Sequence, residues 1–300
     1  RDAIAAGAAT PTPVAGFVAV GPGHNEFQVF DDVRPGEVGT LVDERVDPLD
    51  VTATLLDLAI RGHLVITQLP AASVHGVTDW SFARKPSTDP LLDYERTLLD
   101  AVAPAEGEAA RVSNLAGSVG AVIAKVQSEL YTEVVSRGWF AHRPDATRNR
   151  WSRYAWIGLG VAVVVAVALV VNTAFGLAGL VLIALALGLL LLAEEMPSRT
   201  AAGSSLLGGL DALKSALLVQ PTETVPAGPG YAGLSAVLPY AVVLGGKDRW
   251  LQALVAADDD TAADATDLDW YHGPEDWHLA DLPASLANFI TTVQGTLFSR

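Results

Sequence analysis

The sequence predicts an α+β protein that is mainly helical, with tandem winged-helix-like modules, a two-helix transmembrane hairpin and a C-terminal helical region. Three observations lead to this prediction. Residues 155–193 form a run of 39 residues without a charged side chain. Apolar residues recur at helical spacing on both sides of this run, and a few short stretches alternate between polar and apolar residues, as strands do. The hydrophobic content of 50% exceeds ordinary soluble usage, which indicates a membrane-embedded part.

The uncharged run is about twice as long as one membrane crossing needs. A bilayer core about 30 Å thick takes roughly 20 helical residues at 1.5 Å each. The polar pair Asn172 and Thr173, followed by Gly176, divides the run near its middle and suits a tight turn. We therefore predict two spans over residues 151–195 that meet at this turn. Burial inside a soluble domain is the less favoured alternative, because soluble core helices seldom stay uncharged over such a length.

The residues before the run indicate its orientation. Five arginines precede the first span against one acid, Asp145, and by the positive-inside rule this side of the membrane is cytoplasmic. Trp151, Tyr154 and Trp156 are expected at the headgroup level as interfacial anchors. The five arginines are Arg137, Arg143, Arg148, Arg150 and Arg153.

A two-helix hairpin returns the chain to the side that it left. We therefore expect a multi-pass protein of the plasma (inner) membrane, with residues 1–150 and 195–300 in the cytoplasm. The apolar run of the hairpin, residues 155–193, contains no Asp, Glu, Lys, Arg or His, whereas transport and proton relay usually require ionisable groups at depth. These two helices are therefore predicted to be an anchor rather than a transport pathway.

The sequence before the apolar run predicts a linker over residues 1–35 and a winged-helix-like module over 36–86. It predicts a second helical, winged-helix-like module over 87–150. In the first module Asp47 caps a helix whose first turn contains Pro48. Two alternating stretches, HLVITQ and DWSFARK, then predict a β-hairpin. With PGEVGTLVDE as a preceding helix, the order helix, helix and hairpin is that of a winged helix.

The second module repeats part of this order. One helix is expected to start at Asp89 and a longer one at Ser113 or Asn114, and the longer helix ends with the same Arg-Gly pair that ends the helix of the first module. A C-terminal cytoplasmic region is expected over residues 196–300. It begins with a helix that should pack against the core through four leucines at helical spacing, Leu206, Leu210, Leu213 and Leu217.

A winged helix suggests DNA binding, but the charge of this chain argues against it. The net charge is -15, and phosphate binding needs a basic surface. The segment in the position of a recognition helix, DVTATLLDLAIR, contains one cation, Arg61, whereas base reading needs Arg, Lys, Asn or Gln on an exposed face. We expect no nucleic-acid partner. The expected partners are membrane lipid and another membrane or cytoplasmic protein.

No residue pattern identifies a reaction. Cysteine is absent, which removes thiolate ligands and nucleophiles. The glycine-rich stretches GPGYAG and LGGKDRW lack the preceding strand or the flanking residues of phosphate-binding loops. Catalytic residues, cofactors and metal ligands are therefore not assigned. The densest aromatic cluster contains Trp270, Tyr271, His272 and Trp277. It is a weak candidate for a binding site, because aromatic residues beside Pro and Gly more often attach a loop to a core.

Several phrases occur in a characteristic order along the chain. They are RPGEVGTLVDERVDPLDVTATLLDLAIRGHLVI, the helix with Tyr94-Glu95-Arg96, LYTEVVSRGWF, the paired apolar spans, Arg199-Thr200 with Gly203, and LPYAVVLGGKDRW. From about residue 28 onward, this combination resembles the C-terminal, mostly cytoplasmic portion of a bacterial predicted membrane protein family defined by domain of unknown function 2207. The resemblance implies an envelope protein with an extracytoplasmic β-rich domain, a transmembrane helix, and a cytoplasmic part interrupted by a membrane hairpin. It places Arg1 just inside the membrane and implies no catalytic residues.

The leading hypothesis is a membrane-anchored scaffold or accessory subunit that contacts protein partners through its cytoplasmic modules. A membrane enzyme with a site near residues 270–278 is one alternative, and it requires a closed pocket with buried ionisable groups there. A membrane-tethered transcription regulator is the other alternative, and it requires a basic stripe on the first module.

Overall fold

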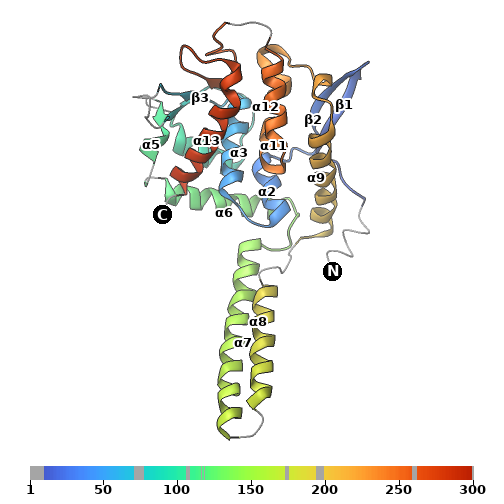
Figure 1. Ribbon diagram of the computed structural model, residues 1–300, viewed down its shortest axis with the longest axis vertical. Coiled ribbons are helices and arrows are strands. Elements are labelled where there is room, and N and C mark those ends of the chain that lie inside the picture. Colours follow the sequence, from blue (N-terminus) through green and yellow to red (C-terminus); the bar gives the residue numbers. More distant parts are fainter. Residues whose placement is uncertain are drawn as a thin grey trace.

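The computed structural model describes residues 10–70, 78–105, 109–115, 117, 119–172, 176–193, 199–258 and 262–298. Figure 1 shows a helical body from which two long helices, α7 and α8, project. The body is mostly helical and contains one two-stranded and one four-stranded sheet, which confirms the predicted α+β class. The strands are β1 (Ala15–Gly21), β2 (His24–Val29), β3 (Leu64–Gln68), β4 (Trp80–Arg84), β5 (Ala110–Arg111) and β6 (Tyr271–His272).

The helices follow in chain order. They are α2 (Pro35–Asp43), α3 (Pro48–Ile60), α4 (Asp93–Val102), α5 (Val112–Leu115), α6 (Gly120–Ser136), α7 (Pro144–Asn172), α8 (Gly176–Ala193), α9 (Ala201–Val219), α10 (Ala232–Ser235), α11 (Leu238–Leu244), α12 (Lys247–Ala256) and α13 (Leu282–Leu297). The short 3-10 helices in the described part of the chain are η1 (Thr222–Thr224), η2 (Pro229–Tyr231) and η3 (Leu279–Asp281).

A β-hairpin made of β1 and β2 opens the described chain. Phe17 on β1 stacks on Trp250 of α12 with ring centroids 5.1 Å apart, and Phe27 on β2 is buried beside Tyr240 of α11. The expectation of an extended linker over residues 1–35 is therefore wrong for the β1–β2 hairpin, and residues 1–9 of that range lie outside the described residues. The two aromatic rings order the hairpin because helices more than 200 residues later supply the apolar surface that they bury.

The first module has the expected order of elements. Helix α3 follows Asp47, whose backbone N–H is bound by Asp50. It ends at Ile60, two residues before Gly62, where φ is +78°. Strands β3 and β4 pair antiparallel, which confirms the predicted β-hairpin. Helix α3 is the central helix of the body, with every residue from Asp50 to Ala59 buried. The segment in the position of a recognition helix is therefore part of the core.

Close approach of α2 and α3 depends on two glycines of α2. A Cβ on Gly36 would overlap the Thr54 hydroxyl, and a Cβ on Gly39 would overlap the Asp50 carboxylate. Any larger residue at these positions would push the two helices apart, because the atoms that it meets belong to a well-packed interior.

The four-stranded sheet joins segments that are far apart in sequence. Its order is β5-β4-β3-β6, with β6 parallel to β3 and β5 antiparallel to β4. Trp80 and Phe82 of β4 meet Phe289 of α13 edge-on, at ring centroid distances of 5.8 and 6.1 Å. The C-terminal region therefore shares one core with the two modules predicted before the membrane.

The second module begins later than expected. Helix α4 starts at Asp93 instead of Asp89, because Pro90 disfavours a helical conformation in the residue before it and the Leu92 N–H is bound by Glu95. The expected long helix is divided into α5 and α6, and Gly117 between them has φ of +76°. After α6 the chain continues into α7 without a β-hairpin.

The C-terminal region is helical, as predicted. All four leucines of the stripe on α9 are buried, so this helix packs against the core as expected. Gly245 and Gly246 both have positive φ and separate α11 from α12. Helix α11 packs against α2 and α3, and its Tyr240 hydroxyl donates to the Val33 carbonyl at 2.7 Å.

Candidate functional site

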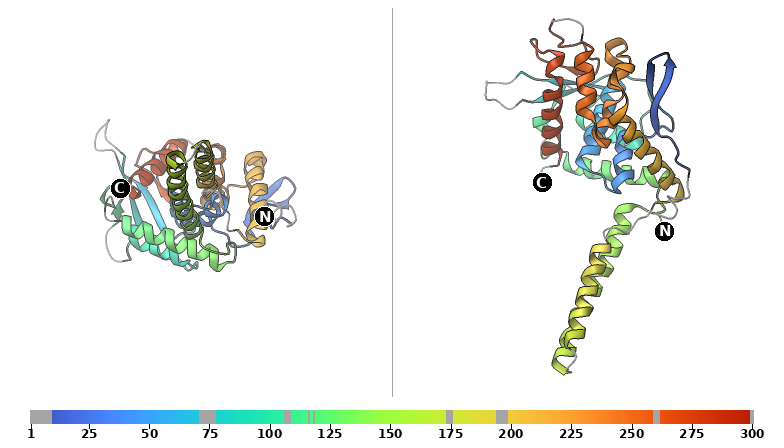
Figure 2. Two further views of the ribbon diagram at one scale, coloured as in Figure 1. Left: turned by 90° about the horizontal axis from the view of Figure 1, so that it is seen from below. Right: turned by 45° about the vertical axis from the view of Figure 1, so that its right-hand side comes forward.

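The surface of α7 and α8 is the most unusual feature of the molecule. Both helices lie side by side and extend away from the body (Figures 1 and 2). Pro144–Val171 is long and apolar enough to cross a membrane, and only 11% of its most apolar window is buried, unlike a core helix of a soluble protein. Helix α8 contributes a shorter apolar stretch, Leu177–Leu191. Most of the exposed large apolar side chains in the described chain lie on these two helices.

The two helices make their closest contact at small residues. A Cβ on Gly179 would lie 2.7 Å from both Cα and Cβ of Ala166, so only glycine allows the approach seen here. Ala166 and Ala186 are buried between the helices. Small residues that let two backbones approach are typical of helix pairs in membranes.

The ends of α7 and α8 carry the residues predicted for the turn and the interface. Asn172 ends α7 and Gly176 begins α8, whereas Thr173 lies outside the described residues. Trp151, Tyr154 and Trp156 are all exposed, on the first turns of α7 that follow the body. The Trp151 and Tyr154 rings meet edge-on with centroids 6.4 Å apart. Their exposure near one end of the apolar surface is what interfacial anchors require.

The helix pair leaves and rejoins the body at one point, which we call the collar. Phe140 and Arg199 form an antiparallel β-bridge, although 58 residues lie between them. The Thr200 N–H donates to the Trp139 carbonyl at 2.9 Å, and the Thr200 hydroxyl donates to the Gly138 carbonyl at 2.7 Å. Gly203 packs on the Trp139 backbone, where a Cβ would overlap the carbonyl oxygen.

Two arginines that flank the helix pair hold α2 at both ends. Arg199 donates to the carbonyls of Leu41 and Val42 at 3.1 and 2.9 Å, at the C-terminal end of α2 where carbonyls lack helical partners. Arg137 lies 2.9 Å from the Glu37 carboxylate in the first turn of α2. The position of α7 and α8 is therefore linked directly to the central helices of the body.

A largely buried network of acids around Arg61 joins helices inside the body. Arg61, at the end of α3, contacts the carboxylates of Asp57 at 2.9 Å and of Glu95 and Asp89 at 2.6 Å each. The Glu95 side chain has no exposed surface. Because a buried carboxylate is costly without a partner, this network requires α3, α4 and the segment before α4 to stay together.

Burial changes the protonation of three acids in this region. Desolvation raises the pKa of Asp50 to about 8, and the nearby acids Asp43 and Asp47 also raise it. Desolvation raises the pKa of Glu37 to about 8 against the lowering effect of Arg137, and it raises the pKa of Asp57 to about 6 against that of Arg61. Asp50 has acids rather than a cation as its charged neighbours, so it is the acid that most clearly stays neutral at pH 7.

Helix capping explains why acids occupy these buried positions. Glu37, Asp50 and Glu95 each accept the backbone N–H three residues earlier, at 2.8, 2.9 and 2.9 Å. They satisfy backbone donors at the starts of α2, α3 and α4. The chemistry of the network is therefore structural: its carboxylates are engaged by helix N–H groups and guanidinium groups. Within the described residues, no group of three or more His, Asp or Glu side chains has an arrangement that would hold a metal ion.

The aromatic cluster belongs to the core. Trp270, Tyr271 and Trp277 are buried and His272 is partly exposed. The Tyr271 hydroxyl donates to Gln68 at 2.6 Å and accepts from the Trp80 indole at 3.3 Å. The two other indole N–H groups donate to Ser235 and Ser285, at 2.9 and 3.2 Å. The polar atoms of these three rings are thus used to fasten the loop that carries β6 onto the sheet and α13.

Sequence reasoning did not select the residues of the collar and the buried network. The signal was present, because Arg61, Glu95, Arg137 and Arg199 all stand in the phrases on which the family resemblance rests. Each of them is a charged residue beside a helix end, a position that ordinarily indicates a solvated cap. Only the tertiary structure shows that Arg61 pairs with the buried Glu95, that Arg137 pairs with the buried Glu37, and that Arg199 donates to the end of α2.

The structure combines an α+β body with an exposed apolar helix that is long enough to cross a membrane. This combination is typical of membrane proteins. The chain belongs to the family whose model is described as predicted membrane protein (DUF2207) C-terminal domain, which matches residues 26–254. This match confirms the resemblance inferred from the sequence. No curated protein and no solved structure matches the chain.

Proposed function

We propose that the protein is a membrane-anchored scaffold or accessory subunit. In this proposal α7 and α8 cross the plasma (inner) membrane as a two-pass hairpin, and the body contacts a protein partner at the cytoplasmic surface. The observation that carries the proposal is the exposed apolar surface of α7 and α8, which has no charged residue from 155 onward and is joined to the body through the collar. Apolar surface in water costs about 25 cal/mol per Å², and lipid removes this cost.

Helix length and flanking charge support two crossings with a cytoplasmic body. Helix α8 has 18 residues, which extend about 27 Å at 1.5 Å each, close to the roughly 30 Å of a bilayer core. The arginines Arg143, Arg150 and Arg153 precede or begin the apolar part of α7. Their charge favours the cytoplasmic side for this end of the hairpin.

A patch on the body far from the collar supports contact with a protein. Val20 near the tip of the β1–β2 hairpin and Leu218 and Val219 at the end of α9 are exposed by 56, 50 and 73%. The backbone of Thr12, before β1, binds Ser205 at the start of α9, and Asn25 binds Thr224 just after its end. Both parts of the patch therefore lie near one end of α9, about 28 Å from the collar at 1.5 Å per residue.

The alternatives have less support. A transcription regulator would need α3 on the surface, but α3 is buried on all sides. An enzyme with a site near residues 270–278 would need an open cavity between the aromatic rings, but three of these rings fill the core and bind one another or neighbouring polar groups. A scaffold needs neither feature.

Single-cysteine labelling tests the membrane topology, because the chain contains no cysteine of its own. A membrane-impermeant maleimide should label Thr173→Cys at the hairpin turn in intact cells, and Ser215→Cys on α9 only after permeabilisation. Labelling of both positions only after permeabilisation would show that the hairpin does not cross the membrane. The reverse pattern would reject the orientation.

A pull-down from gently solubilised membranes tests the partner. Leu218→Glu and Val219→Glu should each deplete a protein that the unmodified chain recovers, because a charge is placed in an apolar contact. Lys214→Glu, an exposed position on the same helix, should retain it. Repeated recovery of no partner, or equal loss with the control, would count against the scaffold function.

A further inference from the structure

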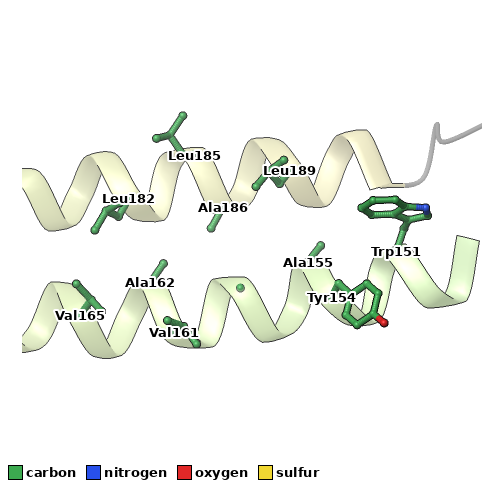
Figure 3. A pocket seen from close by; sticks show the side chains of 11 residues that line it. Trp151, Tyr154, Ala155, Val161, Ala162, Val165, Leu182, Leu185, Ala186 and Leu189 are labelled. Carbon is green, nitrogen blue, oxygen red and sulfur yellow. The ribbon is translucent and has the colours of Figure 1, made fainter. Parts of the chain in front are cut away.

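An apolar groove separates α7 from α8 on the body side of the contact between Ala166 and Gly179. The groove has a volume of about 470 Å³ and extends along α7 from Trp151 to Val165 (Figure 3). Its wall on α8 includes Leu185 and Leu189. Apart from the rim near Trp151 and Tyr154, its lining is aliphatic.

Small residues on α7 create this groove. Ala155, Gly158 and Ala162 line it, and a Cβ on Gly158 would meet no atom within 4 Å. Figure 3 shows Ala155 and Ala162 directed toward α8 across the gap. An unfilled apolar space in a membrane would lose the dispersion contacts that its lining otherwise makes, so we expect an occupant.

The dimensions fit a lipid chain better than a third helix. Val165 lies fourteen residues after Trp151 on α7, which gives a length of about 21 Å at 1.5 Å per residue. One leaflet of the bilayer core is about 15 Å thick, half of the whole. A helix about 10 Å across would need roughly 1,600 Å³ over the same length, more than three times the volume of the groove.

The charge at the open end favours an anionic headgroup. Tyr154 lines the groove, and the guanidinium of Arg150 lies over its ring at 5.9 Å from the centroid. Trp151 lies between the two helices at the same end (Figure 3). An apolar groove that ends at a cation held on an aromatic ring matches a molecule with a long apolar tail and a negative head. This local positive charge contrasts with the net charge of -15 for the chain.

We propose that this groove binds one acyl chain of an anionic phospholipid, with the headgroup phosphate at Arg150. The inference rests on the proposed insertion of α7 and α8 into the membrane. The lipid completes the packing of the hairpin and fixes its depth relative to the collar.

Native mass spectrometry of the full chain tests the inference after reconstitution into vesicles of equal parts phosphatidylglycerol and phosphatidylcholine. The unmodified protein should retain one phosphatidylglycerol in preference to phosphatidylcholine. Gly158→Leu fills the groove and should lower this retention by about tenfold, the effect of losing roughly two buried methylene contacts. Gly160→Leu is the matched control, because Gly160 also has open space around it but does not line the groove.

A charge variant keeps the test independent of helix packing. Arg150→Gln should remove the preference for phosphatidylglycerol over phosphatidylcholine, whereas Lys214→Gln in the body should preserve it. Equal retention of both lipids by the unmodified chain, or equal retention by the Gly158 and Gly160 variants, would overturn the inference. A dimer that Gly158→Leu dissociates would overturn it in favour of helix docking.

Extraction of membranes at alkaline pH distinguishes failure of the lipid site from failure of the membrane anchor. If the unmodified protein stays in the membrane pellet but retains no anionic lipid, the lipid site is wrong and the anchor stands. If the protein is released, both proposals fail.

Discussion

Nη1 of Arg61 lies 2.6 Å from a carboxylate oxygen of Glu95, whose side chain has no exposed surface. This pair joins the end of α3 to the start of α4, and Glu95 also accepts the N–H of Leu92. The contact therefore combines a helix cap with an ion pair inside the core. Such a pair stabilises little by its presence, but removal of one partner leaves a buried charge uncompensated.

We expect Arg61→Met to lower the free energy of unfolding by about 3–5 kcal/mol, the usual effect of breaking a buried ion pair. Arg84→Met is the matched control, because Arg84 pairs with Asp100, whose side chain is 58% exposed. Its effect should stay below about 1 kcal/mol. Urea unfolding of the solubilised protein, followed by circular dichroism, measures both. Equal effects would show that the Arg61 network is not buried in solution.

Gly39→Ala should destabilise the body by about 2 kcal/mol, within the range of overpacked cores. The added methyl group meets the Asp50 carboxylate, which is held in place by the Asp47 N–H. Gly295→Ala in α13 is the control, because nothing lies within 4 Å of its added Cβ. It should be neutral or stabilise by up to about 1 kcal/mol, since alanine is the better helix former. Thermal unfolding of the two variants decides between these outcomes.

Stability should fall as the pH rises from about 4 to 8 and level off above that. The pKa of Asp50 is raised in the folded state from 3.8 to about 8, so the folded state holds a proton that the unfolded state has released. This contribution is complete below about pH 4 and is lost as the pH rises through about 8. Each such group changes stability by about 1.4 kcal/mol per pH unit within this window.

Asp50→Asn should weaken this pH dependence, because asparagine is neutral and still accepts the Asp47 N–H. Part of the slope should remain, since the raised pKa of Glu37 acts in the same direction. Unfolding by urea at pH 6, 7, 8 and 9 measures the slope. Asp248→Asn, on an exposed carboxylate, is the control. An unchanged slope in Asp50→Asn would contradict the neutral state of Asp50.

Arg199→Ala should loosen the end of α2 without unfolding the body. The variant removes the donors to the Leu41 and Val42 carbonyls, and a lost helix cap typically costs about 1 kcal/mol. Hydrogen exchange should therefore become about fivefold faster for amides near the end of α2. Arg45→Ala, close in sequence but on an exposed side chain, should leave these rates unchanged. Equal protection in both variants would show that the collar does not hold α2.

The sequence predicted those features that depend on local chemistry. The uncharged run, the strand alternation in β3 and β4, the start of α3 at Asp47 and Pro48 and the leucine stripe of α9 each follow from residues close together in the chain. Such features can be predicted because the periodicity of a helix or strand appears within a short stretch of sequence. The β1–β2 hairpin was not predicted, because its apolar side chains pack on Trp250 and Tyr240, which lie far away in the sequence.

By itself, then, the sequence determined that one part of this protein is an uncharged, apolar helix pair and that the rest is a mainly helical α+β body. The tertiary structure decided that α3 is a central helix rather than a surface helix that reads DNA, and that β6 joins β3. It also decided that Arg61 pairs with Glu95 and that Arg137 pairs with Glu37. The physical reason is that burial and charge pairing depend on which distant surfaces come together. Local periodicity identifies an apolar or charged face, but it does not identify the face that covers it.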